Sequence, residues 1–182
     1  DFDKAKKFIK FRTYEGQISL AYIAFMEKKL QKAERILKRI YKRQFKIENF
    51  KRPDPYLSGM IGSSLWFQGK NKEAKVFHEE SLETYKSIYG EKNPLLIQPY
   101  INLAMVYFNE NDFENTEFYL RKSLNLQFKF IQEQIPYLPL SQRDEFIKRL
   151  GISYPAVFSA SNIDPKGKYL ALFARLNRHG SV

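Results

Sequence analysis

The chain has 182 residues, 43% of them hydrophobic, a formal net charge of +11 and no cysteine. Without cysteine it can form no disulfide framework, thiolate metal site or cysteine nucleophile, and no apolar run approaches the ~20 residues that span a bilayer. Its first residues do not form a signal peptide and lack an initiator Met. We therefore expect a cytoplasmic segment cut from a longer polypeptide.

The first half of the chain is predicted to form a short helix and then a helical pair. Residues 3–12 have apolar residues on one helical face and resemble the second helix of a unit whose first helix is missing. From about 13 to 50 the apolar spacing predicts two helices, with a turn near Lys28. Prolines then interrupt the helical pattern, and Asp54 is placed to cap the next helix with Pro55 at its first position.

Two further helical pairs follow. The second is predicted over 54–90, with Gly69 ending its first helix and Gly90 closing the second. The third begins at Asn93, where the cap and following proline are repeated, and its second helix is predicted to reach Gln134.

Residues 137–182 do not continue this pattern. A helix is predicted to start near Leu140, and a last helix over 168–178. The last helix could cap the apolar edge of the third pair, or it could fill the groove of the stack as an intramolecular ligand. No stretch has the alternation of a strand, so the sequence predicts an all-α fold with C-terminal capping helices.

A period of 41–42 residues relates the three pairs. Each carries a small residue in its first helix and a second mark twelve positions later. These marks are Ala21, Gly62 and Ala104, followed by Ala33, Ala74 and Thr116. Such a period indicates stacked units that bury apolar faces against their neighbours. We expect a remnant of a preceding repeat over 1–12, three repeats over 13–136, and a helical cap or linker over 137–182.

The units resemble tetratricopeptide repeats (TPR). The fragments that carry the likeness are Leu20-Ala21, Glu73-Ala74, Gly90-Glu91-Lys92-Asn93-Pro94 and Asn102-Leu103-Ala104. The ordinary repeat has ~34 residues, so this chain resembles the longer-repeat subclass of kinesin light chains and many bacterial proteins. The resemblance implies a right-handed superhelical stack. Ser19 and Met60 depart from it, because they stand where the third unit has Asn102.

The C-terminal part is similar to the segment that joins such repeats to a caspase-like (CHAT) protease domain in bacterial proteins. The matching stretches are Arg143-Asp144-Glu145-Phe146, Tyr169-Leu170-Ala171-Leu172 and 175–180. The resemblance implies that the protease domain would follow Val182 and that this chain is its regulatory or sensing arm. The catalytic Cys of that family has no counterpart here.

Catalysis is not expected within these residues. His78 has Ala74 and Leu82 one turn away on its own helical face, and neither can bind a metal or share a proton. A metal site needs three or four converging ligands. We predict no catalytic residue, no metal and no cofactor.

The concave wall of the predicted stack would be formed by the first helix of each unit. By helical phase its residues are Tyr22, Met26, Ser63, Trp66, Phe67, Asn102, Met105 and Asn109. The Asn102 amide could bond a peptide backbone, as the matching Asn does in relatives, and aromatic side chains could bury an anchor. The alternative is that Trp66, Phe67 and Tyr22 are core between helices.

A second candidate surface is the cationic helix within 28–46. Its basic patch comprises Lys32, Arg35, Lys38, Arg39, Lys42 and Arg43. The simpler interpretation is a solvated helix face, and the functional one is a footprint for nucleic acid or an anionic membrane.

The sequence therefore predicts a protein-interaction scaffold that binds a protein or peptide in the concave groove, and an acidic partner is one candidate. A downstream domain of the same polypeptide, or a second copy meeting the exposed edge of the first repeat, are further candidate partners. Nucleic-acid or anionic-surface binding through the basic helix is the alternative function, and we expect neither nucleic acid nor a membrane as the main partner.

Overall fold

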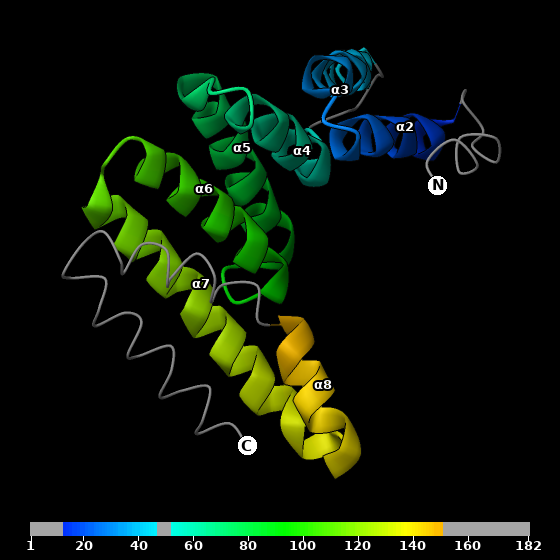
Figure 1. Ribbon diagram of the computed structural model, residues 1–182. Helices are drawn as coiled ribbons and strands as arrows, with labels where there is room; N and C mark the ends of the chain where they lie inside the picture. Colours follow the sequence, from blue (N-terminus) through cyan, green and yellow to red (C-terminus); the bar gives the residue numbers. More distant parts are fainter. Residues whose placement is uncertain (1–12, 47–51, 151–182) are drawn as a thin grey trace. The chain divides into compact units, whose positions relative to one another are not determined.

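The computed structural model describes residues 13–46 and 52–150, and every regular element within them is helical (Figure 1). It confirms the predicted all-α stack of helical pairs. The chain divides between Thr84 and Tyr85 into two units. The helices predicted over 3–12 and 168–178 lie outside the described residues, and the superhelical handedness stays a prediction.

The first hairpin consists of α2 (Tyr14–Met26) and α3 (Leu30–Gln44). The Thr13 side chain caps α2 by accepting a hydrogen bond from the Gly16 N–H at 3.1 Å. Lys28 adopts a left-handed conformation with φ of 60° and makes the predicted turn. α3 buries an apolar stripe, so its many cations are left on the other side.

The second hairpin consists of α4 (Pro55–Trp66) and α5 (Asn71–Tyr89). As predicted, Asp54 caps α4 by accepting from the Tyr56 N–H at 2.8 Å, and Pro55 occupies the first helical position. Gly69 and Gly90 follow the two helices with φ of 76° and 81°, conformations that side chains disfavour.

Within the first unit, α2 and α4 lie side by side and run in the same direction. At their starts the Tyr14 hydroxyl donates to the Asp54 carboxylate. At their ends the rings of Phe25 and Phe67 meet edge to face at 5.2 Å. First helices of consecutive hairpins are therefore parallel neighbours, as a stack of like units requires.

The α3 helix packs against both α2 and α4. It runs antiparallel to α4, because the Ser64 hydroxyl donates to the Leu30 carbonyl at 3.0 Å while Gln44, at the other end of α3, accepts from the Asp54 N–H at 3.3 Å. It also contacts α5, where Tyr41 meets the Phe77 ring at 5.6 Å.

The second unit contains η1 (Pro94–Leu96), α6 (Ile97–Asn109), α7 (Phe113–Gln134), η2 (Ile135–Tyr137) and α8 (Leu140–Leu150). The cap and following proline predicted at Asn93 are present. Asn93 caps a 3-10 turn by accepting from the Leu95 N–H at 2.9 Å, and α6 starts after that turn. α6 and α7 pack antiparallel through aromatic rings, with Tyr107 stacked on Tyr119 at 5.4 Å.

All the predicted marks of the period are buried. Ala21, Gly62 and Ala104 occupy the same place in α2, α4 and α6. Sixteen residues after each of them stands a large side chain that is at most 2% exposed. These side chains are Leu37, His78 and Leu120.

The second hairpin has a His where the other two have Leu, and Gly where they have Ala. A Cβ atom at Gly62 would lie only 2.7 Å from the Cε1 and Nδ1 atoms of His78. Glycine is therefore required by the imidazole ring, which lies directly against the α4 backbone. Burial lowers the pKa of His78 to about 4, so the ring is neutral at pH 7.

We predict that Gly62→Ala destabilises the chain and that His78→Leu rescues it. Alone, Gly62→Ala should cost up to about 2 kcal/mol, because overpacking costs ~1–3 kcal/mol and alanine returns ~1 kcal/mol of helix propensity. The pair Gly62→Ala/His78→Leu reproduces the Ala–Leu combination of the other hairpins and should be at least as stable as wild type. Urea unfolding measures this, and equal destabilisation by Gly62→Ala in both backgrounds would contradict it.

The depressed pKa of His78 predicts an acid-dependent loss of stability. In the unfolded chain His78 has its ordinary pKa of about 6.5 and is protonated below that pH. In the folded chain it stays neutral down to about pH 4. The free energy of unfolding should therefore fall between pH 6.5 and 4, by up to about 3 kcal/mol from this residue. Unfolding followed by circular dichroism should show a smaller fall in His78→Leu. His179→Ala is the control and should keep the wild-type dependence.

Candidate functional site

The accessible side of α2 and α4 carries large apolar side chains. Tyr22 and Met26 on α2 are 49% and 48% exposed, and Phe67 at the end of α4 is 57% exposed. Tyr56, at the start of α4, is also half exposed. We call these four residues, with the neighbouring Ser63, the aromatic face. Tyr22, for which a place in the core between helices was the alternative, is not buried.

Trp66 and Phe67 differ in how much of each side chain is exposed. Phe67 lies between two rings, contacting Phe25 of α2 and Trp66 at centroid distances of 5.2 and 4.8 Å. Trp66 is partly buried, whereas more than half of Phe67 faces outward. The 41-residue period explains this, since Trp66 is equivalent to the partly buried Phe25 and Phe67 to the exposed Met26.

The equivalent side of α6 in the second unit is polar. Its residues are Gln98, Asn102, Met105 and Asn109. The Gln98 amide donates to Asn102 Oδ1 at 2.8 Å, one turn along the helix. Asn102 and Met105 are partly buried, and Asn109 is exposed. The sequence prediction included Asn102, Met105 and Asn109 but missed Gln98 and Tyr56. The repeat spacing could have identified both, because Tyr56 lies 41 residues after Glu15 and 42 residues before Gln98.

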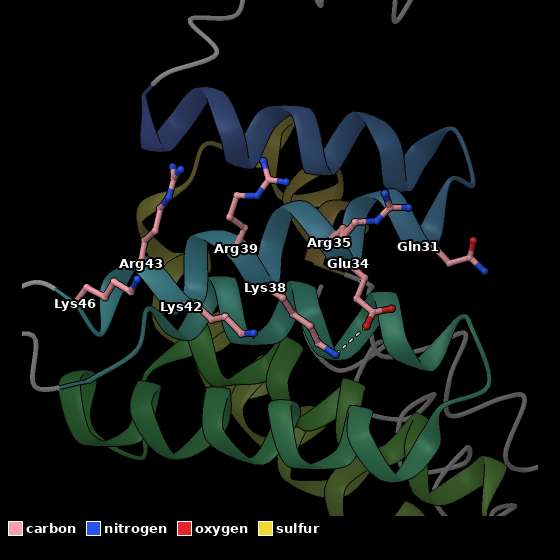
Figure 2. Close-up of a pocket in the computed structure, with 8 residues that line it drawn as sticks. All are labelled: Gln31, Glu34, Arg35, Lys38, Arg39, Lys42, Arg43 and Lys46. Atoms are coloured by element: carbon pink, nitrogen blue, oxygen red, sulfur yellow. Dashed lines mark hydrogen bonds and ion pairs between the residues drawn. The ribbon is translucent and has the colours of Figure 1, made fainter.

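The basic patch on α3 forms a second surface feature. Its side chains enclose a trough of about 650 Å³ (Figure 2). The trough is lined by Gln31, Glu34, Arg35, Lys38, Arg39, Lys42, Arg43 and Lys46. Five of the six residues predicted for the patch line it, whereas Lys32 does not. Lys46 was missing from the predicted patch, although it continues the four-residue spacing of Lys38 and Lys42.

Glu34 is the single carboxylate in this trough, and it accepts several hydrogen bonds. The donors are Lys38 at 2.8 Å, Gln68 at 2.9 Å and Lys70 at 3.0 Å. Burial raises the pKa of the Glu34 carboxyl, but these hydrogen bonds outweigh it and lower the pKa to about 2. Glu34 is therefore ionised and fully engaged, linking α3 to the end of α4.

A second carboxylate links the same hairpins. Glu80 on α5 accepts from the Tyr41 hydroxyl at 2.6 Å and from the Ser58 hydroxyl at 2.5 Å. Burial, together with this carboxylate, raises the pKa of Tyr41, so the phenol stays protonated and donates. These contacts are structural links between hairpins.

The part of the chain that the structure describes contains neither a cluster of metal-binding side chains nor a membrane-spanning helix. No group of three or more His, Asp or Glu side chains converges there. Among the helices of that part, none is both long and apolar enough to cross a bilayer.

The geometry defines a helical-repeat protein in which the two helices of each hairpin approach closely at a small residue. In agreement, residues 56–127, from α4 into α7, match the family model of the tetratricopeptide repeat. Repeats of this family generally mediate protein–protein interaction. The chain is also similar to the crystal structure of BtubC (BKLC) from P. vanneervenii, with 16% identity and a TM-score of 0.49 over 91% of this chain and 80% of that one. No curated protein matches the chain.

Proposed function

We propose that this chain is a protein-interaction module whose aromatic face binds the apolar anchor side chains of a peptide or protein partner. The observation that carries the proposal is the exposure of Tyr22, Met26 and Phe67, each about half accessible on two parallel helices. Large apolar side chains left exposed together on a folded surface are characteristic of interaction sites. Aromatic side chains also contribute most of the binding energy at many interfaces.

The polar side of α6 supplies a different kind of contact. Asn102 Oδ1 already accepts from Gln98, and its amide nitrogen makes no hydrogen bond with the described residues. An amide nitrogen has two hydrogens to donate, so Asn102 is suited to bind a backbone carbonyl of an extended peptide. Asn109 is exposed and offers the same chemistry. The α6 residues are therefore proposed, within the second unit alone, as a contact for the backbone of a peptide.

The broader biological context is a proposal from sequence resemblance. The stretch Arg143-Asp144-Glu145-Phe146 resembles the linker toward CHAT protease domains, as do stretches outside the described residues. On that basis we propose that the chain is a regulatory or sensing region of a larger cytoplasmic bacterial protein of the long-repeat subclass. Reading the gene beyond Val182 tests this directly.

We predict that truncating the aromatic face weakens peptide binding. A random dodecapeptide library selected on the full chain should enrich peptides with Leu, Phe or Met anchors. The emission of Trp66, the chain's single tryptophan, should shift when such a peptide binds beside it. Tyr22→Ala/Phe67→Ala should weaken binding at least about tenfold, which corresponds to ~1.4 kcal/mol.

The matched control is Tyr89→Ala/Phe118→Ala. It removes the same two kinds of ring from positions that are 49% and 51% exposed on other helices. Binding unchanged in Tyr22→Ala/Phe67→Ala, with a thermal midpoint close to wild type, would place the partner elsewhere. Equal loss in both pairs would show that the measured binding is nonspecific.

A further inference from the structure

Positive charge in this chain is concentrated on one helix. Residues 28–46 hold nine of the Lys and Arg side chains and one carboxylate, so this segment carries +8 of the chain's net +11. The remaining residues are close to neutral. A charge that served only solubility would be spread over the surface, whereas concentrated charge of one sign produces a local field that attracts polyanions.

The cations form two rows along α3. Arg35, Arg39 and Arg43 extend along one edge of the helix, and Lys38 and Lys42 along the other, with the trough between them (Figure 2). Within each row the spacing is four residues, so charges repeat about every 6 Å along the helix axis. The trough is therefore narrow, elongated and cationic on both sides.

Most of the cations that line the trough make no ion pair with the residues that the structure describes. Lys38 pairs with Glu34 at 2.8 Å and Glu73 at 3.5 Å. The other cations of the trough have no ion pair or hydrogen bond with any residue that the structure describes. They are Arg35, Arg39, Lys42, Arg43 and Lys46. Like charges four residues apart destabilise a helix, so this arrangement reduces stability, and no residue within 13–46 or 52–150 pairs with these five cations to offset the cost.

The lining of the trough restricts the ligand. It contains no apolar or aromatic side chain, so it lacks the anchors of a protein interface and the stacking platforms of a single-strand site. A membrane-binding helix inserts its apolar face, but here Ala33, Leu37 and Ile40 on that face are buried in the hairpin. Contacts to a phosphate backbone need only cations, and they require no apolar lining.

We propose that the α3 trough binds the phosphate backbone of a nucleic-acid duplex, through its unpaired Arg and Lys side chains and without reading bases. The guanidinium groups can hold phosphate oxygens in pairs, and the ammonium groups act as point charges on the other side. This surface is separate from the aromatic face of α2 and α4. The proposal is therefore independent of the proposed peptide binding, and each can fail without the other.

The test uses the full chain and a fluorescein-labelled DNA duplex of about 20 base pairs, with anisotropy measured across KCl concentrations. Five unpaired cations predict a plot of log affinity against log salt with a slope of about −4 to −5. Arg39→Glu/Lys42→Glu should weaken binding at least about 100-fold at low salt and reduce the magnitude of the slope by about 2. A second duplex of unrelated sequence should bind equally.

The thermal midpoint of the double variant and a charge-matched control distinguish a loss of binding from a loss of folding. In Arg39→Glu/Lys42→Glu each new carboxylate is flanked four residues away by cations, so the thermal midpoint should equal or exceed that of wild type. The control Lys72→Glu/Lys92→Glu changes the net charge equally at exposed positions outside the trough, and it should bind within a few-fold of wild type.

Three results would overturn the proposal. The first is no duplex binding at low salt, and the second is equal loss in both double variants, which would indicate only a net-charge effect. The third is tighter binding of polyglutamate, or of phosphatidylserine vesicles, than of the duplex at equal anion concentration. The expected ranking places the duplex first and a single strand of the same length below it.

Discussion

The close approach of the two helices within a hairpin is the constraint on which the rest of the structure depends. In each of the three hairpins a small residue in the first helix is followed, sixteen positions later, by a large side chain that is almost completely buried. At Gly62 the reason is visible, because the His78 ring occupies the space that a Cβ atom would need. With larger residues at these positions the helices would separate, and the apolar stripes of α3, α5 and α7 would lose their partners.

Polar contacts then fix how the first two hairpins stack. Burial raises the pKa of the Tyr14 hydroxyl, and the Asp54 carboxylate raises it further, so this phenol remains a donor to Asp54. Asp54 also caps α4, and the same residue therefore starts one helix and ties it to its neighbour. Glu34 and Glu80 form the equivalent links for α3. The links through Glu34 and Glu80 are partly buried, whereas the link between Tyr14 and Asp54 is exposed. All three join defined positions, so together they set the register between hairpins more than they add to stability.

Much of the fold could be predicted because periodicity and helix caps are local properties of the sequence. Ala21, Gly62 and Ala104 identify the repeat, while Asp54, Gly69 and Gly90 locate helix ends to within a residue or two. The 3-10 turn after Asn93 was missed, since a cap followed by proline suits either helix type. The dependence of Gly62 on His78 was also missed, because it rests on the distance between two helices that sequence spacing does not give.

The candidate surfaces were predicted less completely than the helices. Helical phase correctly separated the buried stripe of α3 from its cations, yet it could not show which cations pair. Glu34 neutralises Lys38 because Gln68 and Lys70, far away in the sequence, hold its carboxylate in place. Helical phase alone also did not predict which of Trp66 and Phe67 is more exposed. These residues are adjacent, but only the repeat equivalence with Phe25 and Met26 explains why the second is more exposed.

The two helices of a hairpin differ in which side chains their outward positions carry. This explains how one small repeat can have two unlike surfaces. In the first unit, α2 and α4 need their small residues and apolar stripes for packing, and their remaining side carries Tyr22, Met26 and Phe67. The α3 helix buries Ala33, Leu37 and Ile40, and every outward position is then open to charge. Because the two surfaces share no side chain, a change of charge on α3 leaves the aromatic face intact. The two ligands that we propose, an apolar anchor on α2 and α4 and a polyanion on α3, would therefore be recognised independently.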